Sequence, residues 1–96
     1  MKDYSYFGFF SNFSNPTKMK IILSLIDAPL TVNGIVRKVN LEQSNVSHTL
    51  SNLKHCHIVT VAKKGRENVY SLNRETVLPI LKLVDKHVTK NCRFCK

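Results

Sequence analysis

Apolar residues recur every three or four positions along most of the chain, which is the pattern of helices with one buried face. We predict five helices, at about 4–13, 16–26, 32–39, 41–53 and 75–90. The remaining stretch is different, because two short runs rich in β-branched residues, HIVTVA and NVYSL, flank a turn that contains one glycine. Two such runs predict a β-hairpin, or wing, at about 58–72. The expected order α-α-α-α-β-β-α is an α+β fold that is mainly α.

Residues that commonly cap helices stand at the expected helix boundaries. Asn15 precedes a proline that suits a first helical turn, Thr31 can accept hydrogen bonds from the free amides of the next helix, and Asn73 can cap the last helix. Asn40 can adopt a left-handed conformation and so end the third helix. The third and fourth helices are then joined by about three or four residues, which predicts a helix-turn-helix at about 31–56.

The helix at 16–26 is expected to support the core through an apolar face of four residues, Met19, Ile22, Leu23 and Ile26. The first and last helices carry more apolar side chains than one small core needs. Aromatic residues are dense at 4–13, and Leu78 and Leu83 widen the apolar face of the last helix. A dimer interface formed by the first and last helices would cover this surplus, and simple core packing is the alternative for the aromatic residues.

The fourth helix combines a narrow apolar stripe, Val46, Leu50 and Leu53, with an unusual outer face. A solvated helix normally carries many lysines and glutamates, but the outward residues here are polar, short to medium in length and uncharged at neutral pH. Amides and hydroxyls can read base edges in the major groove of DNA. An ordinary amphipathic surface helix is the alternative. The candidates for base contacts are Gln43, Ser44, Asn45, Ser47 and His48.

Basic residues follow this helix and occupy the tip of the predicted hairpin, in the segment KKGREN. A helix-turn-helix followed by a basic wing is much more specific than either half alone. We expect phosphate or minor-groove contacts from Lys54, Lys63, Lys64 and Arg66. Glu42 is out of place on such a surface, because a carboxylate repels phosphates. It either caps the fourth helix or accepts a hydrogen bond from cytosine.

Composition agrees with a small DNA-binding protein. The chain has 96 residues, 43% of them hydrophobic, and a net charge of +9, which favours polyanionic partners, although a protein can also be basic without such a partner. We expect a single domain over 1–96. No apolar run approaches the roughly 20 residues of a membrane helix, and the first ten residues are too short and aromatic for a secretory signal. Three cysteines, an odd number, favour a reducing compartment, so we expect a cytoplasmic protein.

Three segments of the chain together, SNPTKMKIILSLI, TVNGIVRKVNLEQSNVSHTLSNL and KKGRENVYSL, resemble the ArsR-type (ArsR/SmtB) winged helix-turn-helix repressors. That family typically shows S-N-P-x-R-L-x-I-L, a recognition helix of the form Q-S-x-V-S-x-H-L and a wing strand G-R-x-V-Y-x-L. The resemblance implies a homodimeric repressor that binds a pseudo-palindromic site in double-stranded DNA, with the first and last helices forming the dimer interface. Many members release DNA when a metal or metalloid binds.

The residues that form the standard metal sites of this family are missing here. Arsenic-sensing members resemble one another in a cysteine pair on the helix before the turn, and that helix reads IVRKV in this chain. The positions that match the zinc-sensing type, aligned on YSL, are Arg74, Thr76, His87 and Lys90. Only His87 among them could bind metal, so both standard sites are rejected.

Cysteines at two other places leave a further possibility. Some family members bind soft metals through a cysteine at the end of the recognition helix and cysteines of the partner's C-terminal region. Cys56 stands at that helix end, and Cys92 and Cys95 form a C-x2-C motif. These thiolates suit zinc or another soft metal, or a disulfide-based redox response. The plain alternatives are a small buried Cys56 and a frayed tail, and we expect no cofactor to be required.

The combined pattern predicts a sequence-specific DNA-binding transcriptional regulator, and more specifically a repressor. A winged helix used for protein–protein docking is the alternative of a different class, which the basic wing and the uncharged polar helix face disfavour. We do not expect an enzyme. A thioredoxin-like role for Cys92 and Cys95 would require a following helix in a βαβ unit, and the sequence continues for one residue.

Overall fold

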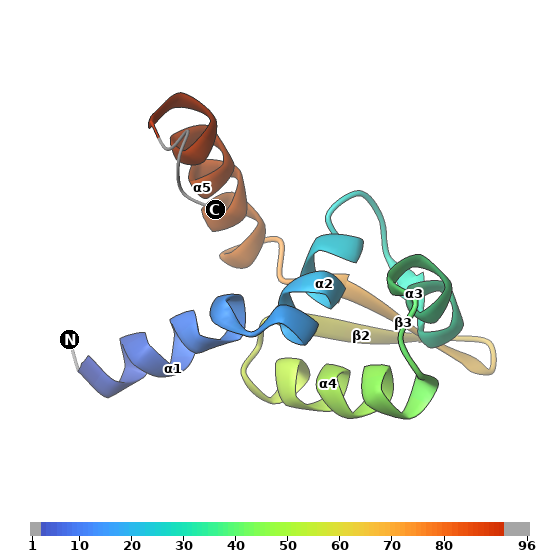
Figure 1. Ribbon diagram of the computed structural model, residues 1–96. Coiled ribbons are helices and arrows are strands. Elements are labelled where there is room, and N and C mark those ends of the chain that lie inside the picture. The colour runs from blue at the N-terminus through green and yellow to red at the C-terminus, as the bar shows by residue number, and fades with distance from the viewer. Residues whose placement is uncertain (1–2, 92–96) are drawn as a thin grey trace.

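The computed structural model describes residues 3–91 of the chain (Figure 1). Its elements follow in the order α1 (Asp3–Ser14), α2 (Pro16–Ser24), β1 (Leu30–Thr31), α3 (Val32–Val39), α4 (Gln43–His55), β2 (Val59–Lys64), β3 (Glu67–Leu72) and α5 (Val77–Asn91). The predicted order of helices and wing strands is confirmed, with strand β1 as an addition. None of the described helices has the length and apolar character needed to cross a lipid bilayer.

Strand β1 completes a three-stranded antiparallel sheet of order β1-β3-β2. Leu30 pairs with Tyr70, and Thr31 pairs with Val69, so β1 covers the edge of β3 that the hairpin leaves free. Two residues are too short to show the alternation of polar and apolar positions that marks a strand in a sequence. The prediction missed β1 for this reason.

The core lies where α2, α3 and α4 pack over the sheet (Figure 1). The predicted stripe of α4, Val46, Leu50 and Leu53, is fully buried. The prediction for α2 is wrong in part, because Leu23 is 49% exposed and the side chains that α2 and its C-cap residue bury most deeply are Ile21, Ile22 and Leu25. The other buried apolar residues are Ile35, Ile58, Val59, Leu72, Val77 and Leu78.

Polar side chains cap the helices where the sequence predicted. The Asn15 side chain accepts a hydrogen bond from the Lys18 amide at 3.0 Å, and Thr31 Oγ1 accepts one from the Gly34 amide at 3.1 Å. Asn40 ends α3 in the left-handed conformation, with φ 57°. These bonds satisfy backbone groups that a helix end otherwise leaves to water.

Asn73 joins the end of the hairpin to α5 and to the turn after α4. Its Oδ1 accepts hydrogen bonds from the amides of Glu75 and Thr76, and its side-chain amide donates to the carbonyl of His57 at 3.0 Å. Because α5 begins at Val77, Pro79 lies in its first turn, where a missing N–H costs nothing. Pro79 therefore belongs to the start of the helix and produces no kink.

Helices α1 and α5 project away from the rest of the molecule (Figure 1). Asn12 is buried near the end of α1, and its Oδ1 accepts a hydrogen bond from Lys18 Nζ of α2 at 3.3 Å. The ring centroids of Phe9 and Phe13 lie 5.1 Å apart, with the rings tilted by 51°, and both side chains pack against the core, whereas Phe7 is 76% exposed. Core packing therefore accounts for part of the aromatic cluster only.

Candidate nucleic-acid interface

Helix α4 presents the predicted base-contacting residues on one exposed side. Its four buried residues, Val46, Thr49, Leu50 and Leu53, fix the rotation of the helix about its axis. As a result, all five candidates are exposed: Gln43, Ser44, Asn45, Ser47 and His48. The Thr49 hydroxyl donates to Asn45 Oδ1 at 3.4 Å, so the Asn45 carboxamide is held along the helix with its amino group remaining available.

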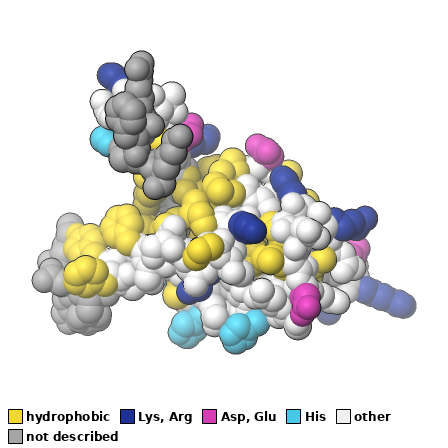
Figure 2. Space-filling view, in the orientation of Figure 1, with side chains coloured by type: hydrophobic (Ala, Val, Ile, Leu, Met, Phe, Trp, Pro, Cys, Tyr) yellow, Lys and Arg dark blue, Asp and Glu magenta, His cyan; other side chains and the backbone are white. Residues whose placement is uncertain are grey.

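The outer face of α4 extends further than the predicted set. At about 100° per residue, Ser51 falls on the same line as Ser44 and His48, and it is exposed. His55 lies one turn beyond Ser51 and is also exposed. Figure 2 shows histidine side chains on the underside of the molecule, along α4. The helical periodicity that selects Ser44 and His48 also selects Ser51, which the prediction from the sequence did not include.

The wing carries its basic residues at the tip of the hairpin. Strands β2 and β3 pair in register from Val59 with Leu72 to Lys64 with Glu67, and Gly65 in the connecting turn has φ +64°. A positive φ at this position favours glycine, which explains the single glycine of KKGREN. Figure 2 shows basic side chains at the end of the molecule where Figure 1 places this tip. The exposed basic residues of α4 and the wing are Lys54, Lys63, Lys64 and Arg66.

A shallow hollow connects the wing with the beginnings of α3 and α4. It is lined by Thr31, Val32, Asn33, Gln43, Glu67 and Asn68. The start of the recognition helix, the start of the preceding helix and the first residues of β3 therefore lie on one face of the molecule. A double helix bound through α4 would therefore lie close to all three segments.

Glu42 is the N-cap residue of α4, and its carboxylate does not act as a cap. The residue has extended backbone angles, φ −65° and ψ 145°, and its carbonyl accepts the amide of Val46 at 3.0 Å. The side chain makes no capping hydrogen bond and is exposed. The first of the two predictions for Glu42, a helix cap, is therefore wrong.

Cys56 is the C-cap residue of α4 and is exposed, so the alternative of a small buried residue is wrong. Cys92 and Cys95 lie outside the described residues. Among residues 3–91, no three side chains of histidine, cysteine, aspartate or glutamate come together as potential metal ligands. His87 is exposed on α5, where its Nδ1 lies 3.5 Å from the side-chain amide of Asn91.

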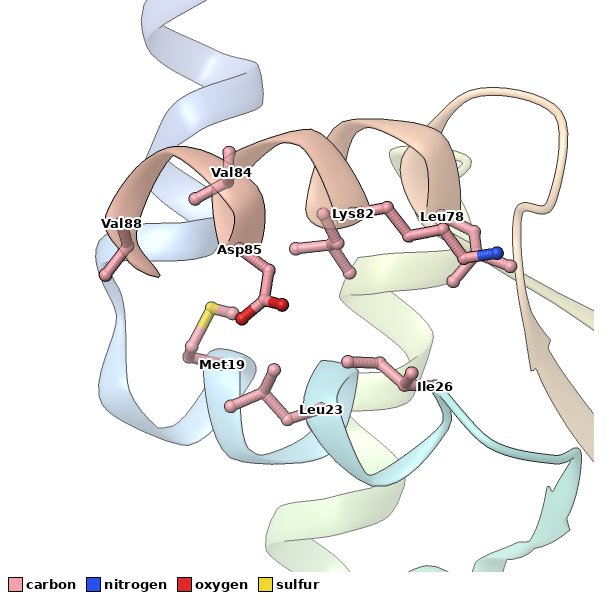
Figure 3. A pocket seen from close by; sticks show the side chains of 9 residues that line it. Met19, Leu23, Ile26, Leu78, Lys82, Val84, Asp85 and Val88 are labelled. Carbon is pink, nitrogen blue, oxygen red and sulfur yellow. The ribbon is translucent and has the colours of Figure 1, made fainter. Parts of the chain in front are cut away.

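An apolar groove separates α2 from α5 on the side of the molecule away from the hairpin tip (Figure 3). It has a volume of about 290 Å³ and is lined by Met19, Leu23, Ile26, Leu78, Leu81, Lys82, Val84, Asp85 and Val88. In Figure 3 the Asp85 carboxylate points from α5 toward Met19. Three of the four residues predicted as the core face of α2 line this groove. These three residues, Met19, Leu23 and Ile26, face α5, whereas Ile22 is buried in the core.

Comparisons with known proteins agree with this architecture. Residues 15–61 match the sequence model of a family described as bacterial regulatory protein, arsR family. The transcriptional repressor SdpR of Bacillus subtilis is 33% identical over 64 residues, which are 67% of this chain and 71% of that repressor. The uncharacterized HTH-type transcriptional regulator MJ1325 of Methanocaldococcus jannaschii is 33% identical over 78 residues, 80% of this chain and 88% of that regulator.

The nodulation protein NolR of Rhizobium meliloti is 34% identical over 74 residues, 77% of this chain. The chain spans 61% of the length of that protein and 57% of the length of the regulator NmtR of Mycobacterium tuberculosis. The crystal structure of NolR from Sinorhizobium fredii superimposes with a TM-score of 0.77 at 29% identity, covering 86% of this chain and 83% of that one. The homodimeric winged helix-turn-helix domain Mb0332 of Mycobacterium bovis shares the fold, with a TM-score of 0.81 at 18% identity over 93% of this chain and 88% of that domain. The winged helix-turn-helix fold is confirmed.

Proposed function

Because the chain belongs to the ArsR family of bacterial regulatory proteins, we propose that it binds a specific sequence of double-stranded DNA and represses transcription. The observation that carries this proposal is the exposed face of α4, which is polar and uncharged from Gln43 to His48 and is followed by a basic wing. Side chains of this kind match the donors and acceptors on base edges, whereas an ordinary surface helix carries charged residues of both signs.

In the proposed complex, α4 lies in the major groove and the wing contacts the flanking backbone. Gln43, Ser44, Asn45, Ser47 and His48 read bases, and Lys54, Lys63, Lys64 and Arg66 contact phosphates or the minor groove. The net charge of +9 supports attraction to any duplex, and the polar face of α4 supports selection among duplexes. This function uses no catalytic residue, so we propose that the protein is not an enzyme and acts in the cytoplasm as a single domain.

The proposed active form is a homodimer joined through α1 and α5. Large apolar side chains exposed on these two helices support it: Tyr6, Phe7, Phe10, Leu83, Val84 and Val88. A second copy would cover them, because monomers rarely leave such a surface in water. A two-fold dimer carries two recognition helices related by symmetry, so its operator is a pseudo-palindrome with half-sites about one helical turn, or a multiple of it, apart.

No metal takes part in the proposed DNA contacts, and no cofactor is required for them. A response to zinc or another soft metal would use Cys56 with Cys92 and Cys95, because the positions that match the zinc-sensing type hold Arg74, Thr76, His87 and Lys90. Cys56 is exposed at the end of the recognition helix, where a ligand could influence the position of that helix.

The test of DNA binding compares two pairs of lysines that differ in position only. Replacing Lys63 and Lys64 of the wing by alanine should weaken binding to every duplex and flatten the dependence of log affinity on log salt by about two units for each wing, or about four for the homodimer, roughly one for each lysine that no longer neutralises a phosphate. Fluorescence anisotropy of labelled duplexes at several salt concentrations measures both quantities.

The matched control replaces Lys86 and Lys90, which are exposed on α5, and removes the same charge. This pair should leave the salt dependence almost unchanged, because only charges close to phosphates release counterions. If the wing pair bound as tightly as the wild type at every salt concentration, the wing would not contact DNA. Equal reductions in affinity for both pairs would instead indicate a nonspecific effect of net charge.

A further inference from the structure

The carboxylate of Glu42 is available for a ligand on the face proposed to meet DNA. It is exposed, and it makes no capping hydrogen bond with the free amides at the start of α4, although glutamate in this position has such amides within its own turn. The Glu42 carboxylate is therefore free to make a contact outside the protein.

Glu42 stands directly before Gln43, at the N-terminal end of the recognition helix. Gln43 lines the hollow shared by α3, α4 and the wing, so the beginning of α4 belongs to the face that a bound duplex would cover. In helix-turn-helix proteins, the first residues of the recognition helix are the ones that contact base edges. In the proposed complex, Glu42 would lie beside Gln43 at the end of α4 that enters the major groove.

A carboxylate at the start of α4 would be unfavourable in a complex with DNA unless it accepted a hydrogen bond from a donor on the DNA. The cations proposed to contact DNA, Lys54, Lys63, Lys64 and Arg66, suit a phosphate backbone, and an anion beside that backbone is repelled. The major groove offers two kinds of donor only, the N4 amino group of cytosine and the N6 amino group of adenine. Guanine and thymine present acceptors there, which an ionised carboxylate cannot approach without repulsion.

We propose that the Glu42 carboxylate accepts a hydrogen bond from the N4 amino group of a cytosine, so that each half-site of the operator carries a cytosine at one fixed position. Cytosine is preferred over adenine because the adenine amino group is adjacent to N7, an acceptor that repels the second carboxylate oxygen. The cytosine amino group is adjacent to a C–H group instead. The inference rests on the proposed function, since it requires α4 to bind in the major groove.

The test is a selection of binding sites from random duplex DNA with the wild type, Glu42→Gln and Glu42→Ala. Anisotropy then measures the affinity for duplexes that carry each of the four bases at the cytosine position. The wild type should prefer cytosine by roughly 5- to 150-fold, the range of one good base contact. Glu42→Ala should lose this preference at that position alone. Glu42→Gln should shift it toward adenine, because an amide can both donate to N7 and accept from N6.

Glu67→Gln is the matched control, because it removes the same charge from the hollow beside Gln43. This control should raise the affinity for all duplexes slightly and keep the preference for cytosine at the fixed position. The two Glu42 variants should melt close to the wild-type temperature, since the Glu42 side chain makes no capping bond. A selected site without a fixed cytosine, or a cytosine preference that persists in Glu42→Ala, would overturn the assignment of Glu42 alone. A wild type that enriches no sequence would overturn the proposed function as well.

Discussion

The helix-turn-helix with its wing buries its large apolar side chains, whereas the two terminal helices, α1 and α5, leave many of theirs exposed. In the first region, Val46, Leu50 and Leu53 of α4 have no exposed surface, and the outward residues are polar or basic. In the second region, Phe7 of α1 is 76% exposed and Leu83 of α5 is 67% exposed. Figure 2 shows the corresponding apolar surface along α1 and near the base of α5.

Apolar periodicity therefore identifies a helix face that will be covered, but it does not identify which part of the same chain or of another chain covers it. For α4 the partner is the sheet and α2 of the same chain, so the stripe is buried within one molecule. For α1, α5 and the outer side of α2, the described residues supply a partial cover only, and a groove of about 290 Å³ remains open. A second copy of the chain is the partner that we propose.

The largest expected effect is on the core of the first region. Leu50→Ala should lower the free energy of unfolding by about 2–5 kcal/mol, because it removes a fully buried side chain and leaves a cavity. Leu83→Ala makes the same chemical change at a 67% exposed position and should cost less than about 0.5 kcal/mol at concentrations where the protein is a monomer. Denaturant titration measures both. Equal effects of the two substitutions would contradict the distinction between the two regions.

Local signals explain why most of the first region could be predicted from the sequence. The caps Thr31 and Asn40, the α4 stripe and the glycine of the wing turn all act through neighbours within a few residues. Each therefore leaves its mark in a short stretch of sequence. The exposed position of the candidate base contacts followed from the same stripe, and their contacts with DNA stay a prediction.

The features that the sequence did not reveal depend on distant contacts. Strand β1 exists because Leu30 and Thr31 reach the free edge of β3, some 40 residues later. The burial of Ile21 and exposure of Leu23 depend on which side of α2 the sheet and α4 occupy, and both sides of α2 carry apolar residues. The sequence also could not show that the Glu42 carboxylate makes no capping hydrogen bond, because a glutamate at this position can either cap the helix or remain free. The structure of the helix end decides between the two.

A charge introduced into the second region should separate dimers without unfolding the chain. Leu83→Asp should raise the dimer dissociation constant by about 30-fold or more, which corresponds to roughly 2 kcal/mol, because the aspartate would be buried in an apolar interface. Sedimentation at micromolar concentration should give twice the chain mass for the wild type and a smaller mass for the variant. Thr89→Asp, at an exposed position of the same helix, is the control for added charge. A Leu83→Asp protein that stayed dimeric would show that this side of α5 is not the interface.

The smallest expected effect comes from a substitution in the helix-turn-helix, and its dependence on protein concentration distinguishes this region from the terminal helices. Thr31→Ala removes the hydroxyl that accepts the Gly34 amide at 3.1 Å, and it should lower the free energy of unfolding by about 1 kcal/mol. Because this bond lies within one chain, the decrease should be the same at every protein concentration, whereas the effect of Leu83→Asp should grow as the wild type dimerises. Thr31→Ser keeps the hydroxyl and should retain most of the stability. Thermal melting at two concentrations measures these differences, and a concentration-dependent decrease in Thr31→Ala would mean that the helix-turn-helix also contributes to the interface.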